Sequence, residues 1–161
     1  MDQRGTRVAT WVPPEEKDPV VLQEPSREHI TIIGAVRPKD GTFIAEMVST
    51  ANWEIVRVFL EGVLELLEPG KKAVVVLDNA KSHHAKALNP WLEEVKDLLE
   101  LKFLPPYSPM LNPIERVWKL LRRLVTHNCY WPQLQLLYDA ILKQFERWSE
   151  PNEQLKKLCV V

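Results

Sequence analysis

An unbroken apolar run at residues 73–77, AVVVL, is the feature that most constrains the fold of this chain. Rich in β-branched residues and free of charge, it predicts a central strand that is buried on both faces of a sheet. Asp78 follows it directly. A carboxylate is therefore expected at the carboxyl end of a central strand, the edge at which parallel sheets place their ligands.

The segment after Asp78 has the spacing of a helix that leads to a second strand. Apolar residues recur three or four positions apart, and Pro90 marks a break or a new helix start after Asn89. These apolar residues are Leu88, Trp91, Leu92, Val95, Leu98 and Leu99. A short strand is expected at residues 101–104. A strand, a helical crossover and a second strand predict a parallel βαβ unit.

A proline-rich connection, PPYSPMLNP at residues 105–113, then delivers the chain to a new helix. Its prolines exclude it from the centre of a sheet and stiffen its path. Asn112 is a favoured N-cap and Pro113 a favoured first residue, so Glu115 falls in the first turn, near the positive end of the helix dipole. One arc of this helix is apolar: Ile114, Val117, Trp118, Leu121, Leu124 and Val125. Glu115 lies at the edge of that arc.

Each polar feature of this stretch also has a purely structural interpretation. Asp78 could form an Asx-turn, and Glu115 could belong to a capping box or pair with Lys119. Four basic residues crowd the turns that begin with Glu115, and they could form a solvated helix face or contact phosphates. They are Arg116, Lys119, Arg122 and Arg123. Structural roles alone do not require this combination: two acids, Asn79, His83 and a proline-stiffened connection in one stretch.

These residues carry a family resemblance. DNAKSHHA at 78–85 and FLPPYSPMLNPIERVWKLLR at 103–122 resemble the catalytic core of the DDE transposases of the mariner-like insertion-sequence superfamily. The likeness extends to GTRVATWVPPEEKDPVV at 5–21 and HITIIGAVRPKDGTF at 29–43, so it covers nearly the whole chain. It implies an α/β, ribonuclease-H-like fold, in which a mixed sheet is flanked by helices and the first strand is shortened or missing.

The resemblance also implies the chemistry of the site. Asp78 and Glu115 match the second and third acids of the catalytic triad and would bind Mg²⁺ or Mn²⁺, with two ions in the complete site. Asn79 and Asn112 are candidates to orient these carboxylates by hydrogen bonds. His83 or His84 could approach the phosphate or a metal-bound water, or could instead cap a helix or pack in the core. The implied partner is DNA, both the terminal inverted repeats of a transposon and the target, and a homodimer is plausible because two ends must be brought together.

One departure from the family pattern concerns the first acid of the triad. The alignment places it before Met1, and Asp2 stands too close to Gly5 to replace it well. We therefore expect a truncated single domain over residues 1–161, without the helix-turn-helix region of such transposases. Two functions stay open: DNA cleavage and strand transfer, or an inactive remnant that keeps the fold and binds only DNA or protein. A resolvase or an RNA–DNA hybrid nuclease fits the proline-rich run less well.

The rest of the chain predicts further elements around this centre. Strands are expected at 7–12, 29–36 and 42–48, with the last two forming a hairpin, and helices at 52–67 and 133–148. This order, hairpin, helix, strand, helix, strand and helix, is that of a ribonuclease-H-like domain.

Composition sets broad limits on the function. The formal net charge of −1 argues against a strongly basic, nonspecific DNA binder without excluding DNA as a substrate. The two cysteines lack metal-like spacing and are expected to be free thiols in a reducing cytoplasm. No apolar run reaches the length of a membrane span. We expect a cytoplasmic protein, associated with the nucleoid if it is bacterial or archaeal.

Overall fold

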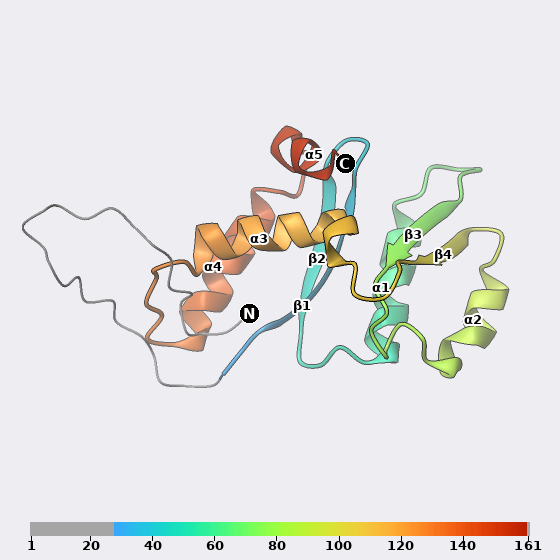
Figure 1. Cartoon of the computed structure of the whole chain (residues 1–161), viewed down its shortest axis with the longest axis horizontal. Coiled ribbons are helices and arrows are strands. Elements are labelled where there is room, and N and C mark those ends of the chain that lie inside the picture. The colour runs from blue at the N-terminus through green and yellow to red at the C-terminus, as the bar shows by residue number, and fades with distance from the viewer. Residues whose placement is uncertain (1–27, 161) are drawn as a thin grey trace, which may run out of the picture.

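A computed structural model describes residues 28–160 as two small sheets with helices around them (Figure 1). The strands are β1 (Thr31–Arg37), β2 (Thr42–Val48), β3 (Ala73–Leu77) and β4 (Leu99–Phe103). The helices are α1 (Trp53–Glu65), α2 (Asn89–Glu94), α3 (Pro113–Val125), α4 (Leu134–Glu146) and α5 (Glu153–Cys159), with short 3₁₀ turns at Lys86–Leu88 and Pro109–Leu111. The predicted strand at 7–12 and the acid Asp2 lie outside the described residues.

Strands β1 and β2 form the predicted antiparallel hairpin, with pairs from Thr31 and Val48 to Arg37 and Thr42. Asp40 stabilises its turn. Its carboxylate accepts hydrogen bonds from Arg37 Nε at 3.0 Å, from the Thr42 amide at 3.0 Å and from the Thr42 hydroxyl at 2.8 Å. Local polar contacts therefore fix the register of the hairpin.

Helices α3, α4 and α5 cover one face of the hairpin and build the larger hydrophobic core. Its buried members are Ile30, Phe43, Val117, Leu120, Leu121, Val125, Leu137, Ile141, Trp148 and Leu155. The Phe43 ring makes edge contacts with three other aromatic rings, of which Trp118 and Trp148 are two. Gly34 lets α3 approach closely, because a Cβ there would lie 2.6 Å from Trp118 Cη2.

Strands β3 and β4 form the predicted parallel pair, with Ala73 opposite Leu99 and Leu77 opposite Phe103. A second buried cluster covers one face of this pair. It contains Val56 and Leu60 of α1, Leu88 of the 3₁₀ turn, Trp91 of α2 and Leu99 of β4 itself. On the opposite face, Val74 is 56% exposed and Val76 is 45% exposed. The prediction that β3 is buried on both faces is therefore wrong for the described structure, because α1 and α2 cover one face only.

Other boundaries differ from the prediction for local reasons. The apolar spacing over residues 88–99 does not form one helix: α2 ends at Glu94, and Leu99 already begins β4. Helix α5 was not predicted, although Asn152 caps it by accepting bonds from the amides of Gln154 and Leu155. The two strand pairs form separate sheets within the described residues.

Two compositional predictions can also be checked on the described residues. Both cysteines, Cys129 and Cys159, are free thiols, as predicted. No helix within residues 28–160 is long and apolar enough to cross a membrane.

Candidate metal site at the ends of the parallel strands

Asp78 lies at the carboxyl end of β3, with 57% of its side chain exposed. Its Oδ1 accepts a hydrogen bond from the Ala80 amide at 3.1 Å, which makes the Asx-turn that a structural role predicts. The same oxygen lies 2.9 Å from His83 Nδ1. Among residues 28–160, no hydrogen bond or ion pair engages Oδ2. The structural role thus uses one carboxylate oxygen and leaves the other open to a cation.

Asn79 joins the ends of the two parallel strands. Its side-chain Nδ2 donates to the Leu104 carbonyl oxygen at 2.6 Å, just beyond the backbone bond from the Leu104 amide to the Leu77 carbonyl. Its Oδ1 lies 3.0 Å from His84 Nε2. The His84 ring in turn stacks on Phe103, with centroids 4.1 Å apart. A polar network therefore fixes the backbone beside Asp78.

Glu115 lies in the first turn of α3, which begins as predicted. Asn112 caps the helix: its Oδ1 accepts from the Ile114 amide at 3.4 Å and its carbonyl oxygen from the Glu115 amide at 3.1 Å. The Asn112 amide donates to Pro109, so Glu115 forms no capping box. The half-buried Glu115 carboxylate makes no hydrogen bond or ion pair with other described residues, Lys119 included. Neither structural interpretation accounts for this acid.

The fold brings the strand ends and the start of α3 to one region. In Figure 1, the arrowheads of β3 and β4 point toward the segment that leads into α3. That segment contains Tyr107, which has a positive φ of 57° and a side chain that is 98% exposed. No group of three or more histidine, cysteine or acidic side chains that could hold a metal ion occurs within the described residues. Asp78 and Glu115 are thus the acids that two different elements present here.

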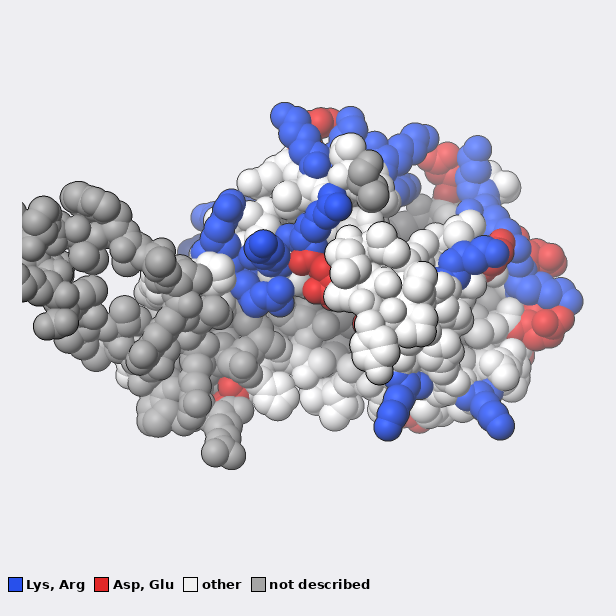
Figure 2. All heavy atoms as spheres, in the orientation of Figure 1, with Lys and Arg blue, Asp and Glu red and all other residues white. Residues whose placement is uncertain are grey.

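The four basic residues of α3 divide into two groups. Arg116 contacts the end of α5, where its Nη1 donates to the carbonyl oxygens of Leu158 at 2.9 Å and Val160 at 2.7 Å. Lys119, Arg122 and Arg123 are exposed. Figure 2 shows Lys and Arg side chains gathered over α3 on the face in view. Three of the four predicted residues therefore lie on an open, basic helix surface.

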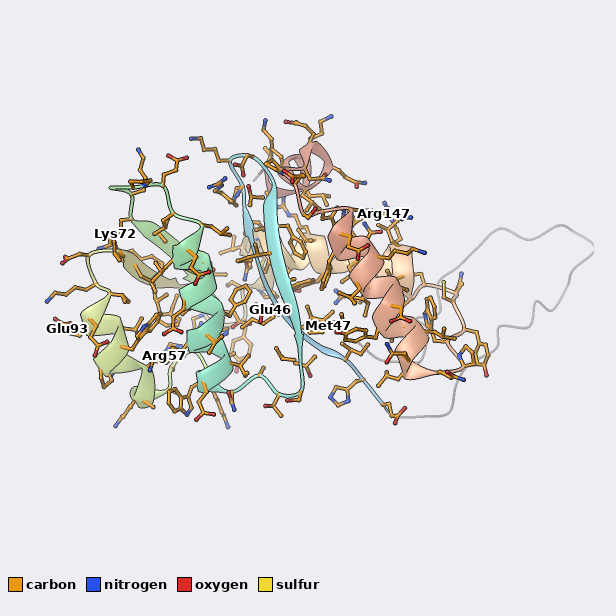
Figure 3. All side chains as sticks on the ribbon, turned by 180° about the vertical axis from the view of Figure 1, so that it is seen from behind. Glu46, Met47, Arg57, Lys72, Glu93 and Arg147 are labelled. Carbon is orange, nitrogen blue, oxygen red and sulfur yellow. The ribbon has the colours of Figure 1, made fainter. Side chains whose placement is uncertain are left out.

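A recess of the described surface lies elsewhere. It has a volume of about 480 Å³ and lies between α1, β2 and α4. Figure 3 shows this side of the molecule, with Glu46 and Met47 of β2 between the two helices. Phe43, Phe59 and Phe145 contribute to its apolar lining, and none of the predicted site residues does. Within the described residues, the candidate site is therefore separate from this recess.

Comparisons with known protein sequences agree with the sequence motifs. A family model described as DDE superfamily endonuclease matches residues 1–137. A similar protein, the uncharacterized protein y4pE/y4sA of Sinorhizobium fredii (strain NBRC 101917 / NGR234), is 35% identical over 91 residues. That match covers 56% of this chain and 64% of the relative, so the chain spans less than two thirds of it.

Solved structures with the same fold include two complexes of Mos1. The Mos1 strand transfer complex matches with a TM-score of 0.65 and 19% identity, over 99% of this chain and 48% of that one. The Mos1 mariner paired end complex with Mn matches with a TM-score of 0.66 and 17% identity, over 96% of this chain and 47% of that one. The chain thus spans about half of these proteins and has the ribonuclease-H-like fold predicted from its motifs.

Proposed function

Because the chain belongs to the DDE superfamily of endonucleases, we propose that it carries the catalytic part of a transposase that cleaves DNA at transposon ends and joins the ends to target DNA. The similar Mos1 structures, named as a strand transfer complex and a paired end complex with Mn, support this proposal. The substrates would be terminal inverted repeats and target DNA. A homodimer would hold two ends together.

The proposed cofactor is Mg²⁺ or Mn²⁺, held by Asp78 and Glu115. Hard divalent cations prefer oxygen ligands and need few protein carboxylates, since they keep several water molecules. When bound, two such ions would activate the attacking water or 3′-hydroxyl and neutralise charge on the leaving oxygen. His83 and Asn79 would orient the Asp78 carboxylate, and Asn112 would hold the helix start that carries Glu115.

One observation supports this assignment above the others. Asp78 follows β3 and Glu115 lies in the first turn of α3, and each keeps carboxylate oxygen that no other described residue binds. Partly buried or structural acids usually have partners, so uncommitted carboxylates suit an external cation. Lys119, Arg122 and Arg123, exposed on the same helix as Glu115, would contact DNA phosphates beside the metal ions.

Metal binding gives a test that does not depend on turnover. Free Mn²⁺ is titrated with the protein and followed by electron paramagnetic resonance. We expect Asp78→Asn and Glu115→Gln each to weaken Mn²⁺ binding about tenfold or more, since even the outer partners of metal ligands contribute about 10–100-fold. The matched controls Asp97→Asn and Glu94→Gln change exposed acids outside the site and should bind Mn²⁺ as the wild type does.

Activity is then measured on the same proteins as Mn²⁺-dependent nicking of supercoiled DNA and joining of labelled transposon ends. Cleavage that both site substitutions abolish and both controls keep would support the transposase proposal. Mn²⁺ binding that needs both acids, without cleavage, would identify a catalytically inactive member of the family. Mn²⁺ binding that neither site substitution weakens would contradict the metal site.

A further inference from the structure

A side chain, not the backbone, makes the last bond between β3 and β4. The backbone ladder ends with the Leu104 amide bound to the Leu77 carbonyl at 2.9 Å. In this parallel register the next amide donor from the second segment would be residue 106, and Pro106 has no amide hydrogen to continue the ladder. Asn79 Nδ2 instead donates to the Leu104 carbonyl oxygen at 2.6 Å and extends the pairing past the ends of the strands.

The Leu104 carbonyl and His84 together fix the orientation of the Asn79 amide. Since Nδ2 of Asn79 donates to Leu104, Oδ1 faces His84 Nε2 at 3.0 Å. An amide oxygen only accepts hydrogen bonds, so His84 must carry its hydrogen on Nε2. The ring has little freedom to leave, because it stacks on Phe103 at 4.1 Å with 24° between the ring planes. Phe103 is the last residue of β4, so this contact holds the His84 ring against the end of that strand.

This network lies between the supports of the two proposed metal ligands. Asp78 immediately precedes Asn79, and Leu104 begins the proline-stiffened run that leads to Glu115. The Asn79–Leu104 bond therefore fixes the strand end that carries one acid against the segment that leads to the other. Rotation of the Asn79 amide would place its oxygen against the Leu104 carbonyl oxygen and break that bond.

We infer that His84 is a positioning residue for the Asp78 and Glu115 metal site, acting through Asn79 on the Leu104 carbonyl. This inference rests on the proposed function. His84 does not touch the metal: its Nε2–H bond to Asn79 holds the strand end that carries Asp78 against the segment that leads to Glu115. Positioning partners of this kind commonly contribute about 10–100-fold to metal affinity.

Two substitutions separate the hydrogen bond from the ring contact. His84→Phe keeps an aromatic ring to stack on Phe103 and loses the donor. His84→Gln loses the ring and keeps an N–H donor at about the reach of Nε2. We expect His84→Phe to weaken Mn²⁺ binding about tenfold and His84→Gln to restore most of the wild-type affinity. Thermal unfolding of both variants shows whether the fold persists.

Asn79 itself provides a direct readout of the contact. In ¹H–¹⁵N spectra, its side-chain amide hydrogens should exchange slowly in the wild type and in His84→Gln, and rapidly in His84→Phe. If Asp78→Asn and Glu115→Gln weaken Mn²⁺ binding and His84→Phe does not, the positioning role is wrong while the metal site stands. If Asp78→Asn and Glu115→Gln leave Mn²⁺ binding unchanged, the proposed function fails first, and the positioning role fails with it. Weakening by His84→Gln without weakening by His84→Phe would assign the effect to ring packing and overturn the hydrogen-bond role.

Discussion

The β1–β2 hairpin and the β3–β4 pair are packed very differently. Three helices pack on the hairpin, and Val117 and Leu121 of α3 are completely buried between them and the strands. The parallel pair has helices on one face, and Val74 on the other is 56% exposed. Helix α3 belongs to both regions, since its apolar face packs on the hairpin while its first turn carries Glu115. The well-packed region thus supplies stability and holds the helix whose first turn carries Glu115, whereas the parallel pair leaves one face exposed in the described structure.

Leu121→Ala should have the largest effect on stability, because this side chain lies at the centre of the hairpin core. We expect a loss of about 2–5 kcal/mol in the free energy of unfolding, measured in urea. The control Leu124→Ala lies on the same helix but is 48% exposed, and it should cost far less. Similar losses for the two variants would show that α3 does not pack as described and would remove the contrast between the regions.

Two glycines test the same contrast with one added methyl group. In Gly34→Ala the new Cβ would meet Trp118 Cη2 at 2.6 Å and the Ile44 carbonyl oxygen at 3.0 Å, so we expect a cost of about 1–3 kcal/mol. In Gly62→Ala the new Cβ meets nothing within 4 Å, and removing a glycine from the interior of α1 should stabilise by about 0.5–1 kcal/mol. Urea unfolding measures both. A stable Gly34→Ala protein would place α3 farther from β1.

The elements themselves were largely predictable from the sequence, because their signals are local. The bounds of β3 follow from one apolar run that ends at an acid, and the start of α3 follows from Asn112 and Pro113. Helix α5 has a comparable signal, since Asn152 is followed directly by an acid at the helix start. The exposed face of β3 could not be predicted. An all-apolar strand sequence does not indicate whether helices cover one face of the strand or both.

The acids of the candidate site could be predicted from the sequence, but the contacts of its side chains could not. The sequence places Asp78 at a strand end and Glu115 at a helix start, but whether Glu115 pairs with Lys119 depends on side-chain geometry that the spacing leaves open. The contacts that matter most join distant residues. Asn79 reaches Leu104, 25 positions away, and Arg116 reaches Leu158, 42 positions away. No local pattern encodes such pairs.

The pH dependence of stability gives a smaller, more specific test of the hairpin. The pKa of Asp40 lies well below its usual value. The main cause is the hydrogen bond from Arg37, and the bonds from the Thr42 amide and hydroxyl lower the pKa further. A lowered folded-state pKa adds stability above the unfolded pKa of about 4, and this stability is lost as the pH falls below that value. Because the pair is partly exposed, the contribution should be at most about 1 kcal/mol.

Asp40→Asn should therefore be less stable than the wild type at pH 7, and the difference should shrink between pH 4 and pH 2. Urea unfolding at several pH values measures it. Asp97→Asn, an exposed acid outside the hairpin, serves as the control and should show no comparable trend. A difference that stays constant down to pH 2 would mean that the Asp40 charge does not stabilise the hairpin turn.

The smallest expected effect lies on the bare face of the parallel pair. Val74→Thr replaces a methyl group by a hydroxyl on a side chain that is 56% exposed, so stability should change by no more than about 0.5 kcal/mol. Its neighbour Val75 packs against the α1 and α2 cluster, and there the hydroxyl would lose water without a partner, at a cost of about 1–3 kcal/mol. Urea unfolding of the two variants compares the faces of one strand. Equal losses would mean that another part of the protein covers the outer face of β3, and the contrast between a packed hairpin and an open strand pair would then have to be abandoned.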